Sequence, residues 1–393
     1  NKNKCCSVSF REGGCKRHEN KSPFRQNKTP IYFDKTPFCT NETPFYFDDC
    51  KILKTNKIED MKKTISALCI ALFSWGAFAQ NNSEAENTNK WIDTYSTLNQ
   101  AKDWNGMLAK MSECRAEVPN WEFADYYEGI ANYNLKNYQK AVEALSAFLQ
   151  KNASTPAAYL FRANAYLEMN EADFAIKDYD EYLKTAPKDV PAMLSKAQAR
   201  MINKDYANYI ADLTAVLAIE PSNMDALTNR ASAYAIQKDW NAVIADLTTA
   251  IAMKEDANFF YDRGFAQYSL KTPESIAAAI ADFTKAEQLG MTTEKLYTSR
   301  AQCNKMLKKF AEEAEDYTKL LAIDAANVNY YYNRGVALFK SNKFKEALAD
   351  FDKAIELNPK YVNAYKYRAN TKGKLGDKAG QAADAAKVKE LTG

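Results

Sequence analysis

Side chains of opposite charge recur at a fixed spacing in this chain of 393 residues. An arginine or lysine precedes an aspartate by 16 residues in six places, and one further pair is 19 residues apart. The pairs are Arg162 with Asp178, Lys196 with Asp212, Arg230 with Asp246, Arg263 with Asp282, Arg300 with Asp316, Arg334 with Asp350, and Arg368 with Asp384. Such groups can form ion pairs, or they can bind a charged ligand. Because a ligand site needs no sevenfold repetition, the spacing favours a structural ladder of ion pairs, within or between units.

Residue types that support catalysis are scarce. The single histidine is His18, and the sequence contains no GxSxG, HExxH, P-loop or GxGxxG motif. Carboxylates are plentiful, so an acid pair of the glycosidase kind stays open on composition. The recurrence of the aspartates argues instead that they serve the repeat. The sequence therefore predicts no catalytic residue, no metal site and no cofactor.

The charged residues belong to a longer repeated pattern. A charged residue followed by a small one stands at eight places, separated by 34, 34, 34, 33, 37, 34 and 34 residues. The clearest unit runs from Val328 to Tyr361 and contains, in order, Tyr331, Arg334, Gly335, Ala347, Asp350, Phe351, Ala354 and Pro359. Small residues allow two helix axes to approach, and proline ends the second helix. Each unit therefore predicts two antiparallel helices that stack on the next unit.

This period and this order of residues resemble the tetratricopeptide repeat. The resemblance implies an all-α fold, a right-handed α-solenoid of stacked helix-turn-helix repeats over residues 88–393, with about nine units of which the first and last are degenerate. The step of 37 residues holds three extra residues within 269–275. We expect them to lengthen the turn inside that unit.

The resemblance also indicates where a ligand would bind. In proteins that this chain resembles, the first helices line a concave groove that holds a peptide or another protein. Matching the units predicts these groove residues: Phe123, Tyr126, Tyr133, Asn164, Gln198, Tyr261, Phe265, Tyr268, Gln302, Tyr332 and Phe339. Aromatic and amide side chains suit a peptide. A carbohydrate-binding or enzymatic groove, a structural spacer, and packing of some of these rings against neighbouring units are the alternatives.

One binding mode of the family is not predicted. Lys366 and Asn370 match the start of a clamp for a C-terminal carboxylate. They lie in the last unit, however, where no further unit can complete the clamp.

The N-terminal region has a different character. Met61-Lys62-Lys63, the apolar residues 64–78 and the small residues Ala77 and Ala79 predict a secretory signal peptide over 61–79, cleaved after Ala79. A buried helix or a membrane anchor is the alternative. We interpret residues 1–60 as disordered, non-native upstream translation, or else as a genuine extension that contains cysteines, and residues 80–87 as a linker. The expected location is periplasmic or secreted, without a membrane span after cleavage.

Cleavage would change the charge and the cysteine content. Residues 80–393 hold 39 Lys and Arg and 42 Asp and Glu, and no basic stripe that would bind nucleic acid. Cys114 and Cys303 would remain, and we expect both to pack as small apolar residues. The predicted partner is another protein or a peptide.

Overall fold

The computed structural model describes residues 82–393, and each regular element in this range is an α-helix. The helices are α2 (Asn82–Gln100), α3 (Trp104–Ala109), α4 (Met111–Glu117), α5 (Phe123–Asn134), α6 (Tyr138–Lys151), α7 (Pro156–Glu168), α8 (Ala172–Leu183), α9 (Val190–Ile202), α10 (Tyr206–Ile219), α11 (Met224–Ile236), α12 (Trp240–Met253), α13 (Ala257–Leu270), α14 (Pro273–Gln288), α15 (Glu294–Met306), α16 (Phe310–Ile323), α17 (Val328–Lys340), α18 (Phe344–Leu357), α19 (Val362–Lys374) and α20 (Lys378–Thr392).

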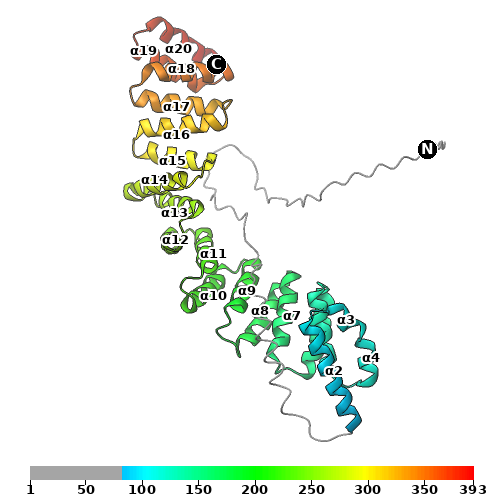
Figure 1. The fold of residues 1–393 in the computed structure, drawn as a ribbon. Coiled ribbons are helices and arrows are strands. Elements are labelled where there is room, and N and C mark those ends of the chain that lie inside the picture. Colours follow the sequence, from blue (N-terminus) through cyan, green and yellow to red (C-terminus); the bar gives the residue numbers. More distant parts are fainter. Residues whose placement is uncertain (1–81) are drawn as a thin grey trace, which may run out of the picture. The chain divides into compact units, whose positions relative to one another are not determined.

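Neighbouring helices pack in pairs. From α5 and α6 to α19 and α20, the two helices of a pair pack together, and the second helix also packs against the first helix of the next pair (Figure 1). In the first pair, α2 is the first helix and the second is broken at Lys110 into α3 and α4. The described residues thus form nine pairs. This confirms the predicted all-α architecture of stacked helix-turn-helix units.

The turn inside each pair has a common backbone conformation. One residue per turn has a φ between 57° and 86°, namely Lys102, Lys136, Asn170, Lys204, Lys238, Lys271, Lys308, Asn342 and Gly376. This left-handed conformation cannot continue a right-handed helix, so the first helix ends there. In four units the next residue, Asp103, Asp205, Asp239 or Asp377, accepts a hydrogen bond from a first-turn N–H of the second helix. A strained residue and a capping residue therefore separate the two helices.

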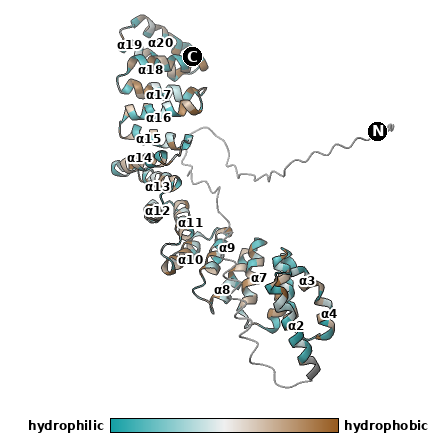
Figure 2. Cartoon of the chain, in the orientation of Figure 1, coloured by the Kyte–Doolittle hydropathy of each residue, from teal (hydrophilic) through white to brown (hydrophobic). Residues whose placement is uncertain are grey.

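Small residues of the first helices pack against large residues of the second helices. At Gly335 a Cβ atom would lie 2.7 Å from the ring of Phe351, so the close approach requires glycine. The core continues from pair to pair, as one cluster joins Val190 of α9 to Ala233 of α11. Every labelled helix carries both apolar and polar residues, as expected for helices that bury one side (Figure 2). Cys114 and Cys303 are free and buried, as predicted.

The three extra residues of the pair formed by α13 and α14 do not lengthen its turn, which corrects the sequence-based expectation. The turn holds only Lys271 and Thr272, whereas the preceding pair has three turn residues, 237–239. The extra residues extend the helices, because α14 has 16 residues and α12 has 14. Thr272 and Ser275 form a capping box, and Pro273 occupies the first turn of α14, which explains this early start.

The segment predicted as a linker is helical for most of its length, since α2 begins at Asn82. The predicted signal peptide and the interpretation of residues 1–60 lie outside the described residues. Among the helices of residues 82–393, none is long and apolar enough to cross a membrane.

Candidate functional site

Six arginines of the first helices bind the aspartate that their spacing predicts. The guanidinium groups of Arg162, Arg230, Arg263, Arg334 and Arg368 each donate two hydrogen bonds to both carboxylate oxygens, at 2.6–2.9 Å. Arg300 donates both bonds to one oxygen of Asp316, at 2.7 and 3.0 Å. Each pair joins the first helix of a unit to its second helix. The predicted ladder of ion pairs therefore forms within the units.

The same arginines also reach the preceding unit. The Nη1 atom of Arg230 donates to the hydroxyl of Thr214 at 2.9 Å, and Thr214 lies on the second helix of the unit before. The equivalent acceptors of the other arginines are Ser146, Thr248, Thr284, Thr318 and Asp352. Each arginine thus connects three helices. The sequence analysis missed these acceptors, although a polar residue 15 or 16 positions before each arginine was a usable signal.

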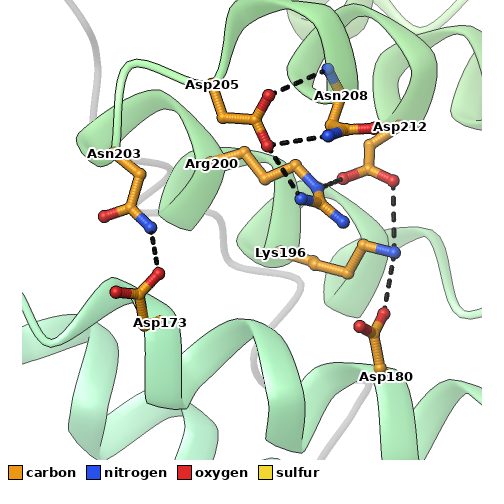
Figure 3. Close-up of polar contacts among 8 residues, drawn as sticks. All are labelled: Asp173, Asp180, Lys196, Arg200, Asn203, Asp205, Asn208 and Asp212. Carbon is orange, nitrogen blue, oxygen red and sulfur yellow. Dashed lines mark hydrogen bonds and ion pairs between the residues drawn. The ribbon is translucent and has the colours of Figure 1, made fainter.

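The unit of α9 and α10 achieves the same connection with different residues (Figure 3). Lys196 lies 3.0 Å from Asp180 of the preceding unit and 3.2 Å from Asp212 of its own unit. Arg200, one helical turn later, donates to Asp212 at 2.9 Å and to Asp205 at 3.0 Å. A lysine cannot make two parallel bonds to a carboxylate, so the second cation supplies the missing contact.

The electrostatics of these pairs agree with a structural role. Burial raises the pKa of Asp178 and of Asp316 above the ordinary aspartate value, although an arginine faces each of them. The hydrogen bonds to Asp246 raise the pKa of Arg230. Each charged group of a pair has a partner of opposite charge inside the protein, which agrees with a structural role.

The opposite side of the first helices is free of these contacts. Successive helical residues are 100° apart, and on α13 Arg263 and Gly264 face the second helices. The far side of α13 then carries Asn258, Asp262 and Phe265. We call the corresponding side of all the first helices the first-helix face.

Two of the predicted groove residues do not lie open on this face. Tyr126 is 2% exposed and Tyr261 is 1% exposed, and both belong to the apolar core. The ring of Tyr261 packs 5.5 Å from that of Phe283 on α14. These tyrosines lie at the edge of the first-helix face, where they fill the space between helices. The prediction that they line an open groove is therefore wrong, and both are core residues.

Comparison with known families agrees with this geometry. Two models, both described as tetratricopeptide repeat, match residues 126–190 and 328–361. The chain contains tetratricopeptide repeats. No curated protein sequence matches it.

Solved structures with tetratricopeptide repeats are also similar to this chain. The C-terminal part of a repeat protein from Cytophaga hutchinsonii is 19% identical, with a TM-score of 0.47, and the match covers 61% of this chain and 97% of that one. A repeat protein from Parabacteroides merdae is 18% identical, with a TM-score of 0.39, over 60% of this chain and 93% of that one. YrrB, described as having an unusual peptide-binding site, is 17% identical, with a TM-score of 0.40, over 47% of this chain and 95% of that one.

The remaining predicted groove residues of the repeats are partly buried. They are Phe123, Tyr133, Asn164, Gln198, Phe265, Tyr268, Gln302, Tyr332 and Phe339. Some of them already have partners. Asn164 accepts a 2.6 Å hydrogen bond from Tyr179, and the ring of Tyr332 contacts those of Tyr361 and Tyr367. Several of these positions therefore contribute to packing as well as to the accessible face.

The structure brings a second row of residues onto the first-helix face that the sequence analysis did not select. In each of these repeats it is the residue directly before the recurring arginine or lysine, and in five consecutive repeats it is Ser195, Asn229, Asp262, Ser299 and Asn333. All five are polar and partly buried. Measuring the helical angle from the arginine, rather than matching the aromatic positions, would have found them.

Asp262 differs electrostatically from the rest of this row. Burial raises the pKa of its carboxyl group to about 7, Lys295 of the next repeat lowers it, and Asp256 raises it. Lys295 itself lies over the ring of Tyr261, with its Nζ atom 4.7 Å from the ring centre. At the junction of α13 and α15, the first-helix face therefore contains a partly buried acidic group, whereas the same position is neutral in the repeats before and after it.

Proposed function

We propose that this chain is a non-catalytic scaffold that binds another protein or a peptide along its first-helix face. The observation that carries this proposal is that two sides of the first helices have different contacts. On one side, the arginines bond to aspartates and hydroxyl groups of the second helices. The first-helix face instead presents partly exposed aromatic and amide side chains over consecutive repeats.

The chemistry of this face suits a polypeptide. Amide side chains such as Gln302 and Asn333 can both donate to and accept from an extended backbone. The rings beside them, including Phe265, offer apolar area for side chains. A face that runs through many repeats can contact a long segment, and each repeat adds a similar set of groups.

The binding experiment compares two variants of the full chain. Asn229→Arg with Gln302→Arg places two large cations on the first-helix face. Ala245→Arg with Ala322→Arg places the same two charges in the same repeats, on exposed positions of the second helices. Proteins captured from a cell-envelope extract are identified by mass spectrometry, after circular dichroism has shown equal helix content.

We expect the first variant to lose partners that the second variant and the unmodified chain retain. If both variants lose the same partners, or if both retain them, the interface lies elsewhere than on this face. Hydrolysis of envelope polysaccharides by the pure chain would overturn the non-catalytic assignment.

We further propose that the chain acts outside the cytoplasm. Its support is the basic start at Met61-Lys62-Lys63, the apolar run after it and the small residues before Gln80. N-terminal sequencing of the chain recovered from periplasm or medium should begin at Gln80. A chain found intact in the cytoplasm would contradict export.

A further inference from the structure

The inference concerns Asp262, the acidic residue on the first-helix face of α13. The residues at the same position in the repeats before and after it are neutral, Asn229 on α11 and Ser299 on α15. A neutral polar side chain therefore satisfies the packing at this position. A carboxylate is not required there by the architecture of the repeat.

Asp262 also lacks the arginine partner that the aspartates of the ion-pair ladder have. Asp246 and Asp282 each receive two bonds from an arginine, whereas no cationic group of residues 82–393 lies within ion-pairing distance of Asp262. The adjacent guanidinium group of Arg263 donates its hydrogen bonds to Asp282 and Thr248. Lys295 is near enough to influence Asp262 but lies over the ring of Tyr261.

This arrangement is unfavourable for the free protein. Removing a carboxylate from water without a partner costs free energy, and the raised pKa of about 7 records that cost. Beside it, the hydroxyl group of Tyr261 is buried and has no hydrogen-bond partner in the described part of the chain. Unsatisfied polar groups and perturbed carboxyls gather at functional sites more often than elsewhere.

We propose that Asp262 recognises a cationic group of the bound polypeptide, namely a lysine or arginine side chain or an amino terminus. A carboxylate in a partly buried site pairs strongly with such a group. The ammonium group of Lys295, which lies over the ring of Tyr261, shows that a cation is already accommodated next to Asp262. The proposal rests on the proposed function, since it names the chemistry that the first-helix face selects.

The first test uses a random 12-residue peptide library displayed on phage. It is selected on the full chain, on Asp262→Asn and on Glu315→Gln. The second variant is the matched control, because Glu315 is an exposed carboxylate on the second helix α16, away from the first-helix face. Asparagine and glutamine have nearly the shapes of aspartate and glutamate, so neither substitution disturbs packing.

We expect the unmodified chain and Glu315→Gln to enrich peptides with lysine or arginine at a fixed position, and Asp262→Asn to enrich peptides without that preference. Enrichment of peptides with no basic position, or the same basic preference in Asp262→Asn, overturns the role of Asp262 and leaves the proposed function standing. If the unmodified chain enriches no peptide at all, the proposed function fails and this inference fails with it.

The second test is the pH dependence of binding for one selected peptide. Its lysine stays charged between pH 6 and pH 8, while the ionised fraction of a carboxyl with a pKa of about 7 rises about tenfold. Affinity for the lysine peptide should therefore rise by up to about tenfold over this range. A copy with norleucine in place of lysine should show no such rise, and neither should Asp262→Asn. The same pH dependence in Asp262→Asn would show that a group other than this carboxyl causes it, and would overturn the proposal.

Discussion

At the scale of single residues, the arginines determine how the helices are connected. Arg230 bonds to Asp246 on its own second helix and to Thr214 on the second helix before it. The Asp246 side chain is only 6% exposed, so its charge depends on the arginine for compensation. One side chain therefore links two repeats and neutralises a buried group.

Replacing Arg230 with alanine should destabilise the chain by about 3 kcal/mol, because Asp246 would then be buried without a partner. Urea unfolding measures the change. The double variant Arg230→Met with Asp246→Leu removes both charges, and it should recover most of the loss. If the double variant is as unstable as the single one, the lost stability comes from packing rather than from the stranded charge.

Glu313 provides a prediction that depends on pH. It is 2% exposed, one of its carboxyl oxygens lacks a partner among the described residues, and burial raises its pKa from 4.5 to about 6. Lys305 and Lys340 oppose this rise. Because folding favours the protonated form, the folded state loses stability as the pH rises from about 4.5 through about 6.

Glu313→Met should therefore raise the free energy of unfolding by about 2 kcal/mol at pH 8, with a smaller gain at pH 4. Glu315→Met, at an exposed position of the same helix, serves as the control and should change little at either pH. Urea unfolding at both pH values measures the effect. An equal gain at pH 4 and pH 8 would show that the carboxyl charge is not the cause.

At the scale of elements, the turns inside the repeats carry backbone strain. Eight of the nine left-handed turn residues have a Cβ atom, and Lys238 is one of them, with a φ of 61°. This conformation costs residues other than glycine about 1–2 kcal/mol. Asp239 offsets part of that cost by capping α12 through the N–H of Ala242.

Lys238→Gly should raise the stability of the chain by about 1 kcal/mol, since glycine adopts a positive φ without steric cost. Lys238→Ala removes the same side chain but keeps the Cβ atom, so it should leave stability nearly unchanged. Thermal unfolding of both variants measures the difference. A similar gain in both would attribute the effect to the lysine charge.

The elements also show how far the sequence could predict this structure. The period of 34 residues and the spacing of Arg334 from Asp350 were sufficient for the fold and for the ion pairs, because both follow from the geometry of paired helices. The position of Tyr261 was not predictable in this way. A ring at the edge of an exposed helix face is exposed or buried depending on the side chains of neighbouring helices. For Tyr261 the neighbour is Phe283. Similarly, the extra residues before Asp282 extended a helix because Thr272 and Pro273 start one early.

At the scale of the whole molecule, the main helix contacts within residues 82–393 join helices of the same repeat or of neighbouring repeats. A second helix such as α12 packs against α11 of its own pair and against α13 of the next pair. The bond from Arg263 to Thr248 on α12 follows the same path. Stability in such a stack is a sum of terms for single repeats and for neighbouring interfaces. A substitution in one repeat should therefore destabilise that repeat and its neighbours, and its effect should decrease with distance along the stack.

Arg230→Ala tests this view of the molecule when hydrogen exchange is measured on every helix. The substitution breaks contacts of α11 with α12 and with α10, so backbone amides of α10 to α13 should exchange faster. The amides of α19 and α20, which no contact of Arg230 reaches, should keep their exchange rates. Arg368→Ala is the matched control at the other end, since Arg368 bonds to Asp384 and Asp352, and it should produce the reverse pattern. Faster exchange along all helices in both variants would mean that the stack unfolds as one cooperative unit, and that the interfaces between repeats are stronger than the repeats themselves.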